Sequence, residues 1–325
     1  MAYLTKNIQS EATLMKLIHH AFPERKLKDL HELTEGYFNI AYEVSFEDGT
    51  KSILKIAPDP KVTVMTYEQN IMEAEVRSMQ LVAQKMRVPL PEVEFYDPSC
   101  TLCSSPYFFM QKLNGKSLSS QKPLLTSGQV SHIHFLVGSL NKEINLITNG
   151  SFGYPGQTAL QGKIWFDVFA KMLRAVILDA RKESIDLTIS SSELFELLEQ
   201  DKGIFQSIVT PRLVHWDIWD GNIFVEDGKL MGIIDWERCL WGDPLMEVGF
   251  RSYAQSADFL RGYGIEEFTE EEKRRILWYD LYLLMIVAQE PVYRGYETAD
   301  SYHWATALLR EKYTELQETS SYSGN

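Results

Sequence analysis

The chain has 325 residues, of which 45% are hydrophobic and 24% are charged, close to the average of soluble globular proteins. This composition excludes a disordered chain, a collagen-like repeat and a disulfide scaffold, and the length favours two domains or lobes. The 45 acidic residues outnumber the 32 basic ones and give a formal net charge of −13. Because no basic stripe is present, we expect no nucleic-acid partner.

The cysteine content and the first residues indicate where the protein acts. An odd, sparse set of cysteines suits a reducing compartment, and the pair Cys100 and Cys103 predicts a tight turn with free thiols rather than half of a zinc site. The amino-terminal residues lack the apolar core of a signal peptide. The most hydrophobic window, residues 281–288, is too short to cross about 30 Å of hydrocarbon. We expect a cytoplasmic protein with no membrane partner, and the oligomeric state stays open.

The first third of the chain favours strands around one helix. The predicted elements, in chain order, are a helix over residues 8–22, strands over 42–46 and 52–56, a helix over 66–86 and an extended run over 107–113. Asp48-Gly49 between two alternating runs predicts a hairpin. Pro89 and Pro91 follow the second predicted helix and cannot continue it.

The rest of the chain favours helices with one β-rich interruption. Apolar residues at helical spacing predict helices over residues 127–146, 164–179, 191–200 and 270–290. Thr269 is the expected N-cap of the last of these helices. Between Leu213 and Asp235 the pattern changes to short strands. We therefore expect an α+β fold with two lobes, residues 1–113 and residues 114–325.

The β-rich interruption gathers polar side chains at one end of a predicted hairpin. Two short apolar strands there are joined by the turn Glu-Asp-Gly-Lys, residues 226–229. Folding of this hairpin brings Asp235 near Asn222 and near the loop that holds Asp217. Such oxygen ligands suit Mg²⁺, which leaves coordination sites for phosphate and water. The segment predicts a Mg²⁺–phosphate site, although each residue alone would be common in a turn.

The spacing of these residues resembles a known family. His215-x-Asp217, then Asn222 and, after a hairpin, Asp235, follow the order of the kinase catalytic loop and its metal-binding aspartate. The runs His-Trp-Asp-Ile-Trp-Asp-Gly-Asn and Ile-Ile-Asp-Trp-Glu resemble the aminoglycoside phosphotransferase and choline-kinase-like superfamily. Trp216, where protein kinases carry arginine, matches this small-molecule branch. The resemblance spans residues 33–250 and is most specific over residues 213–250.

The resemblance implies a bilobal, protein-kinase-like fold that transfers a phosphoryl group from ATP or GTP, with Mg²⁺, to a hydroxyl of a small molecule. The sheet-rich lobe, residues 1–113, would bind the nucleotide, and the helical lobe would hold the catalytic loop and the acceptor. Asp217 would be the catalytic residue that orients or deprotonates the acceptor hydroxyl. Asn222 and Asp235 would hold the metal, and His215 would brace the loop by hydrogen bonding.

The same resemblance implies nucleotide contacts in the first lobe. Lys55, which alone would be an ordinary strand lysine, becomes the candidate for the α- and β-phosphates. Its glutamate partner is expected at Glu75, with Glu73 as the alternative. Gly36 and Asn39 belong to the turn that would cover the nucleotide, and no Gly-x-Gly-x-x-Gly run is present there.

A hinge between the lobes is implied by residues 110–113. Met110 would border the adenine, while the Gln111 carbonyl oxygen and the Leu113 N–H group would form hydrogen bonds with it. Backbone contacts leave no signature in the side chains. A buried strand that ends in an Asn-Gly turn therefore remains an equally compatible interpretation of the same run.

The acceptor stays open between an aminoglycoside and a metabolite such as a sugar, a choline-like alcohol or an amino-acid-derived alcohol. Two hypotheses from other classes are a catalytically idle nucleotide-binding regulator and a Mg²⁺-dependent phosphohydrolase. The complete set Asp217, Asn222 and Asp235 argues against the idle regulator, and a hydrolase would not need Lys55.

Acidic residues around the motif predict that the acceptor carries positive charge. Asp220 and Glu237 add two carboxylates to those of Asp217 and Asp235. Tyrosines and tryptophans are dense over residues 278–304, where they form either part of the core or a wall that holds an ammonium group.

Overall fold

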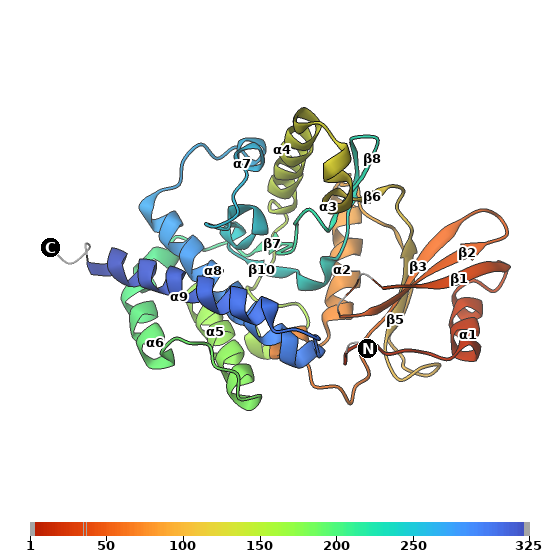
Figure 1. Ribbon diagram of the computed structural model, residues 1–325, viewed down its shortest axis with the longest axis horizontal. Coiled ribbons are helices and arrows are strands. Elements are labelled where there is room, and N and C mark those ends of the chain that lie inside the picture. Colours follow the sequence, from red (N-terminus) through yellow and green to blue (C-terminus); the bar gives the residue numbers. More distant parts are fainter. Residues whose placement is uncertain (1–3, 35, 37, 322–325) are drawn as a thin grey trace.

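The computed structural model describes residues 4–34, 36 and 38–321. Strands gather at one end of the molecule and helices at the other, at the right and the left of Figure 1. The expected α+β fold class, with a sheet-rich amino-terminal region and a helical carboxyl-terminal region, is confirmed. Among the described residues, no helix has both the length and the apolar content needed to cross a membrane.

A five-stranded antiparallel sheet forms the strand-rich end within the described residues. Its strands, in spatial order, are β1 (Leu27–Leu33), β2 (Ile40–Phe46), β3 (Lys51–Ile56), β5 (Tyr107–Gln111) and β4 (Val93–Asp97). The predicted hairpin is β2–β3, and Asp48 accepts a hydrogen bond from Thr50 N (2.8 Å) in its turn. The sequence patterns did not predict β1, because its leucines recur every third residue instead of alternating.

Helices cover both faces of this sheet (Figure 1). On one face, α1 (Glu11–Ala21) packs Leu17 into a cluster of buried residues from β2, β3 and β5. Helix α1 begins later than predicted because the Ser10 side chain caps it by accepting from Thr13 N (3.2 Å). On the other face, α2 (Ile71–Lys85) is separated from a preceding 3₁₀ turn by Asn70, which has a left-handed conformation (φ +56°).

Strands of the β-rich interruption pair with strands before and after it in two small sheets. Strands β6 (Lys116–Ser117), β8 (Ile223–Glu226) and β9 (Lys229–Ile233) form one sheet, and β7 (Arg212–Val214) pairs with β10 (Leu240–Gly242) in the other. The predicted hairpin is β8–β9. Gly115 precedes β6 with φ +85°, and a Cβ atom there would lie 2.3 Å from the Val225 oxygen, so only glycine fits this approach.

The remaining helices are α3 (Leu118–Gln121), α4 (Ser127–Ile144), α5 (Trp165–Lys182), α6 (Ser191–Gln200), α7 (Ala257–Tyr263), α8 (Glu270–Arg294) and α9 (Asp300–Ser321). Four of them match the predicted helices, whereas α3, α7 and α9 were not predicted. Thr269 caps α8 as expected by accepting from Glu272 N (3.3 Å). The Cys100 and Cys103 thiols are free, and Cys100 has φ +55°, as the predicted tight turn requires.

One apolar core joins the two ends of the molecule. This shared core contains Met110 of β5 and Met79 of α2 together with Trp236 and most of α8. The aromatic residues of α8 belong to it. Tyr279 is fully buried, and its hydroxyl accepts from Trp165 Nε1 (2.8 Å), so the core interpretation holds for this helix and a substrate-facing wall does not.

Candidate active site

The loop between β7 and β8 brings two predicted site residues together. Asn222 Nδ2 donates to the Asp217 main-chain oxygen (2.9 Å) and to Asp217 Oδ2 (3.0 Å). The Asn222 main-chain oxygen accepts from Ile234 N (3.0 Å), which fixes the segment after β9 against the same loop. Asp235 follows Ile234 directly. The hairpin therefore brings Asp235 to the loop that holds Asp217 and Asn222, as the spacing predicted.

A buried glutamate that the sequence analysis missed holds this loop. Glu247 Oε1 accepts from His215 N (2.9 Å), and Glu247 Oε2 accepts from Trp216 N (2.9 Å). Two side-chain amides, Asn141 of α4 and Asn145 directly after it, donate to the same Oε1 atom at 2.7 and 3.0 Å. The sequence feature that could have indicated Glu247 is its position as the single carboxylate in the otherwise apolar run Leu-Met-Glu-Val-Gly-Phe. Glu247 anchors the main chain at the start of the catalytic loop.

The loop has a strained residue next to its aspartate. Trp216 has φ +64°, a left-handed conformation that costs a bulky residue ~1–3 kcal/mol. Its ring is fully buried and stacks on Tyr282 of α8, with 5.4 Å between ring centroids and 15° between planes. Burial of the indole and the bond to Glu247 offset the strain, so the loop keeps one conformation.

His215 braces the loop, as expected. Asp217 N donates to His215 Nδ1 (3.2 Å), and the imidazole lies 4.5 Å from the Trp236 ring. Burial lowers the pKa of His215 to about 4, so its ring is neutral at physiological pH and Nδ1 can accept this bond.

Lys55 connects the sheet to the segment after β9. Its Nζ atom lies 2.6 Å from Glu75 Oε1 of α2 and 2.8 Å from Asp235 Oδ1. Burial acts to lower the pKa of Lys55, but the charges of Asp235 and Glu75 outweigh it and the pKa is raised. Glu73, the alternative partner, forms an ion pair with Arg77 on the outer side of α2. Lys55 is therefore a charged lysine between two carboxylates.

Three carboxylates at this position could hold a metal. Oxygens of Glu75, Asp235 and Glu237 lie within 4.8 Å of one another. Burial acts to raise the pKa of Asp235, but Lys55 outweighs it and lowers the pKa, so Asp235 stays ionised. The Asp235 side chain is 32% exposed, and Glu75 Oε2 is buried without a hydrogen-bond partner among the described residues. These hard oxygen donors fit Mg²⁺.

Asp217 has an unusual electrostatic setting. Burial is the main cause that raises its pKa to about 7, and the Arg238 guanidinium acts in the opposite direction. Arg238 Nη2 donates to Glu290 Oε1 (2.7 Å), and Arg294 Nη2 lies 3.3 Å from the same oxygen. Sequence reasoning missed this charged cluster, because Arg238 directly follows the motif whereas its partner Glu290 lies 52 residues further along the chain.

The residues of the predicted nucleotide-covering turn and hinge differ in their burial. Asn39 is buried, and its Nδ2 donates to Glu237 Oε2 (2.9 Å), whereas Gly36 is exposed. Met110 is buried in the shared core. Gln111 is exposed and Leu113 is half-buried.

The hinge segment also contacts the helical part. A Cβ atom on Gly232 of β9 would lie 2.5 Å from Leu113 Cδ1, so the hinge rests closely on this strand. Both Gln111 and Leu113 line a surface pocket of about 600 Å³ together with residues of the β2–β3 turn. Neither Lys55 nor Asp235 lines that pocket.

Asp220 does not add free negative charge to the site, contrary to expectation. Its carboxylate lies 2.7 Å from Lys122 Nζ and 2.9 Å from His134 Nε2. Burial acts to raise the pKa of Asp220, but these two partners outweigh it and lower the pKa. The charge of Asp220 is therefore matched by basic residues of the helical part.

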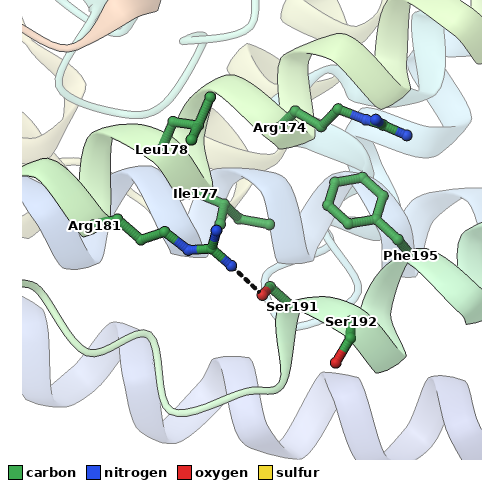
Figure 2. A pocket seen from close by; sticks show the side chains of 7 residues that line it. All are labelled: Arg174, Ile177, Leu178, Arg181, Ser191, Ser192 and Phe195. Atoms are coloured by element: carbon green, nitrogen blue, oxygen red, sulfur yellow. Dashed lines mark hydrogen bonds between the residues drawn. The ribbon is translucent and has the colours of Figure 1, made fainter.

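A pocket elsewhere on the molecule has no connection with the motif. It measures about 350 Å³ and is lined by residues of α5 and α6 (Figure 2). Arg181 Nη2 donates to Ser191 Oγ (2.6 Å), and the Arg174 guanidinium lies 4.8 Å from the Phe195 ring centroid. None of the predicted site residues lines this pocket, so the candidate site is the cluster around Lys55, Asp217 and Asp235.

Comparison with known proteins finds a family match over most of the chain. Residues 29–279 match the model of the phosphotransferase enzyme family (APH). In sequence, 117 residues are 27% identical to a subtelomeric hrmA-associated cluster protein of Aspergillus fumigatus. That match covers 36% of this chain and spans 22% of the length of the curated fungal relative.

Solved structures share the fold over nearly the whole chain. A Ralstonia eutropha protein assigned as an aminoglycoside phosphotransferase has a TM-score of 0.66 at 11% identity, covering 95% of this chain and 98% of its own. A thermostable variant of aminoglycoside phosphotransferase APH(4)-Ia, in complex with ADP and hygromycin B, has a TM-score of 0.64 at 17% identity. The coverage is 92% of this chain and 97% of the variant.

Proposed function

Because the chain belongs to the phosphotransferase enzyme family, we propose that it transfers the terminal phosphoryl group of ATP or GTP to a hydroxyl of a small molecule. The observation that carries this proposal is the arrangement of Lys55 between Glu75 and Asp235, with Asp217 fixed beside them by Asn222. Residues 1–113 would bind the nucleotide and residues 114–325 the acceptor. The expected cytoplasmic location is part of the same proposal.

Asp217 would act on the acceptor. Its carboxylate accepts the hydroxyl proton while the acceptor oxygen bonds to phosphorus, and the bond from phosphorus to the bridging oxygen of the nucleoside diphosphate breaks. The transition state of phosphoryl transfer is loose, so the base needs little strength and positioning matters more. The hydrogen bond from Asn222 Nδ2 to Asp217 Oδ2 orients the Asp217 side chain, and the second bond fixes the Asp217 main chain, which supports such a role.

Lys55 would contact the nucleotide phosphates. Its ion pair with Glu75 keeps the ammonium charged and directed toward Asp235. Asn222 and Asp235 would hold Mg²⁺, which when bound would supply positive charge to the phosphate oxygens. Met110, Gln111 and Leu113 would border the base, and Gly36 and Asn39 would cover the phosphates.

The acceptor is a small molecule in this proposal. The related APH(4)-Ia structure contains the aminoglycoside hygromycin B, which supports an amine-bearing alcohol. A positively charged acceptor is now supported by the ionised Asp235. It is not supported by Asp220, by the aromatic residues of α8, or by Glu237, because burial raises the pKa of Glu237 well above its usual value. A metabolite with a hydroxyl group remains within the same proposal.

Acceptor-dependent release of ADP tests the function. We would incubate the full chain with Mg²⁺·ATP and a panel of aminoglycosides, amino alcohols and neutral sugars, with the Asp217→Asn variant as the control. The proposal expects ADP release that depends on one acceptor class and is lost in the variant. Equal release without any acceptor would indicate a phosphohydrolase, and nucleotide binding without release would indicate an idle regulator.

A further inference from the structure

An amino-terminal strap, defined here as residues 4–9, connects the two ends of the molecule beside the candidate site. Leu4 N donates to the Arg294 oxygen (3.0 Å) at the end of α8. Three residues later, Asn7 Nδ2 donates to the Ala57 oxygen (3.2 Å), just after β3. The strap therefore crosses from the helical part to the sheet within four residues.

Lys6 lies between these two attachments and reaches the predicted nucleotide-covering turn. Its Nζ atom donates to the Asn39 main-chain oxygen (2.8 Å) and lies 3.5 Å from the position that a Cβ atom would take on Gly36. The ammonium thus binds Asn39 and lies next to Gly36, the two residues that sequence analysis assigned to this turn. Asn39 in turn donates to Glu237, a member of the carboxylate trio with Asp235.

The Lys6 ammonium group uses one of its N–H donors in hydrogen bonds to the described residues. A lysine carries three N–H donors, and among the described residues the partner of Lys6 is one neutral carbonyl group. Lys6 is half-buried, and burial lowers its pKa, so its charge is incompletely solvated and would gain from an anion. Lys55, by contrast, already contacts two carboxylates.

We propose that Lys6 is a second phosphate-binding lysine of the nucleotide site, supplied by the strap rather than by the sheet. The inference rests on the proposed function, because it assumes a nucleoside triphosphate under the Gly36–Asn39 turn. It explains how a turn without a glycine-rich run binds phosphates. A charged side chain beneath the turn takes the place of successive main-chain N–H groups.

Direct binding measurements on the full chain test this role. The probes are Mg²⁺·AMP-PNP, which carries three phosphates, and adenosine, which carries none. The variants are Lys6→Met, Lys6→Gln, which keeps a donor without the charge, and Lys6→Arg, which keeps the charge. The matched control is Lys26→Met, because the Lys26 side chain of the same lobe is 81% exposed. Thermal melting of each variant verifies that it is folded.

We expect Lys6→Met and Lys6→Gln to weaken AMP-PNP binding about tenfold and to leave adenosine binding within about twofold. Lys6→Arg should restore most of the AMP-PNP affinity, and Lys26→Met should change neither probe. Equal weakening of both probes would show that the strap only supports the fold, and unchanged AMP-PNP binding would remove Lys6 from the site. Either result overturns this inference alone, whereas a wild-type chain that binds no AMP-PNP overturns the proposed function as well.

Discussion

One amide group of Asn222 contacts Asp217 twice, at the main-chain oxygen (2.9 Å) and at the carboxylate (3.0 Å). This double contact closes the loop on itself and orients the carboxylate. Asn222 therefore links the proposed base to the proposed metal site, and the two functions can be separated by substitutions on either side of it.

Replacement of the proposed base should affect turnover and not nucleotide binding. Asp217→Asn is expected to lower kcat by about 10³-fold, because general-base positioning contributes on this scale, and to leave nucleotide affinity within a few-fold. Steady-state kinetics and direct binding measure the two effects. The matched control is Asp220→Asn, whose charge is already taken up by Lys122 and His134. Turnover by Asp217→Asn at the wild-type rate would contradict the assignment.

The two glutamates of α2 should behave differently. Glu75→Gln removes the charge beside Lys55 and is expected to raise the nucleotide KM about tenfold, since the lysine then loses one of its two anchors. Glu73→Gln, on the outer side of the same helix, should leave kinetics unchanged. Equal effects of the two substitutions would mean that the Lys55–Glu75 pair has no part in nucleotide binding.

Removal of Asp235 should reveal the metal site. Asp235→Ala deletes an ionised carboxylate beside Lys55, so nucleotide binding is expected to lose its dependence on Mg²⁺. Titration of Mg²⁺ against nucleotide binding, with EDTA as the reference, measures this dependence. A variant that keeps the wild-type Mg²⁺ response would place the metal elsewhere.

We expect Glu247 to stabilise the folded protein. Glu247→Gln has one acceptor oxygen, so it cannot accept from His215 N and Trp216 N as well as from Asn141 and Asn145. We expect a loss of about 3 kcal/mol in the free energy of unfolding, because buried donors to a charged group lose their partner. Chemical denaturation measures the loss, and the exposed Glu266→Gln is the control. A difference below about 0.5 kcal/mol between the two variants would contradict this role.

The dependence of kcat/KM on ionic strength tests whether the acceptor is positively charged. For a positively charged acceptor, kcat/KM should fall as ionic strength rises, because salt screens its attraction to the ionised Asp235. A neutral sugar should give a flat profile in the same assay. A flat profile with the physiological acceptor would end the cationic hypothesis and leave the phosphotransferase assignment intact.

The sequence predicted those parts of the molecule that have a local pattern. The hairpin β2–β3 alternates around an Asp-Gly turn, and the motif from His215 to Asp235 has fixed spacing. Strand β1 was missed because its leucines follow a helical period. The bond between Lys6 and Asn39 joins residues 33 positions apart, and that between Arg238 and Glu290 joins residues 52 apart. Such contacts depend on tertiary packing and have no signal in the sequence alone.

The apolar core shared by Met79, Met110, Trp236 and α8 has a consequence for expression and unfolding. A cut after residue 113 would expose apolar side chains on both fragments, which makes each fragment prone to aggregate. The intact chain should melt in a single cooperative transition, with calorimetric and van't Hoff enthalpies in agreement. Mobility between the sheet and the helices is then limited to adjustments that leave this core closed.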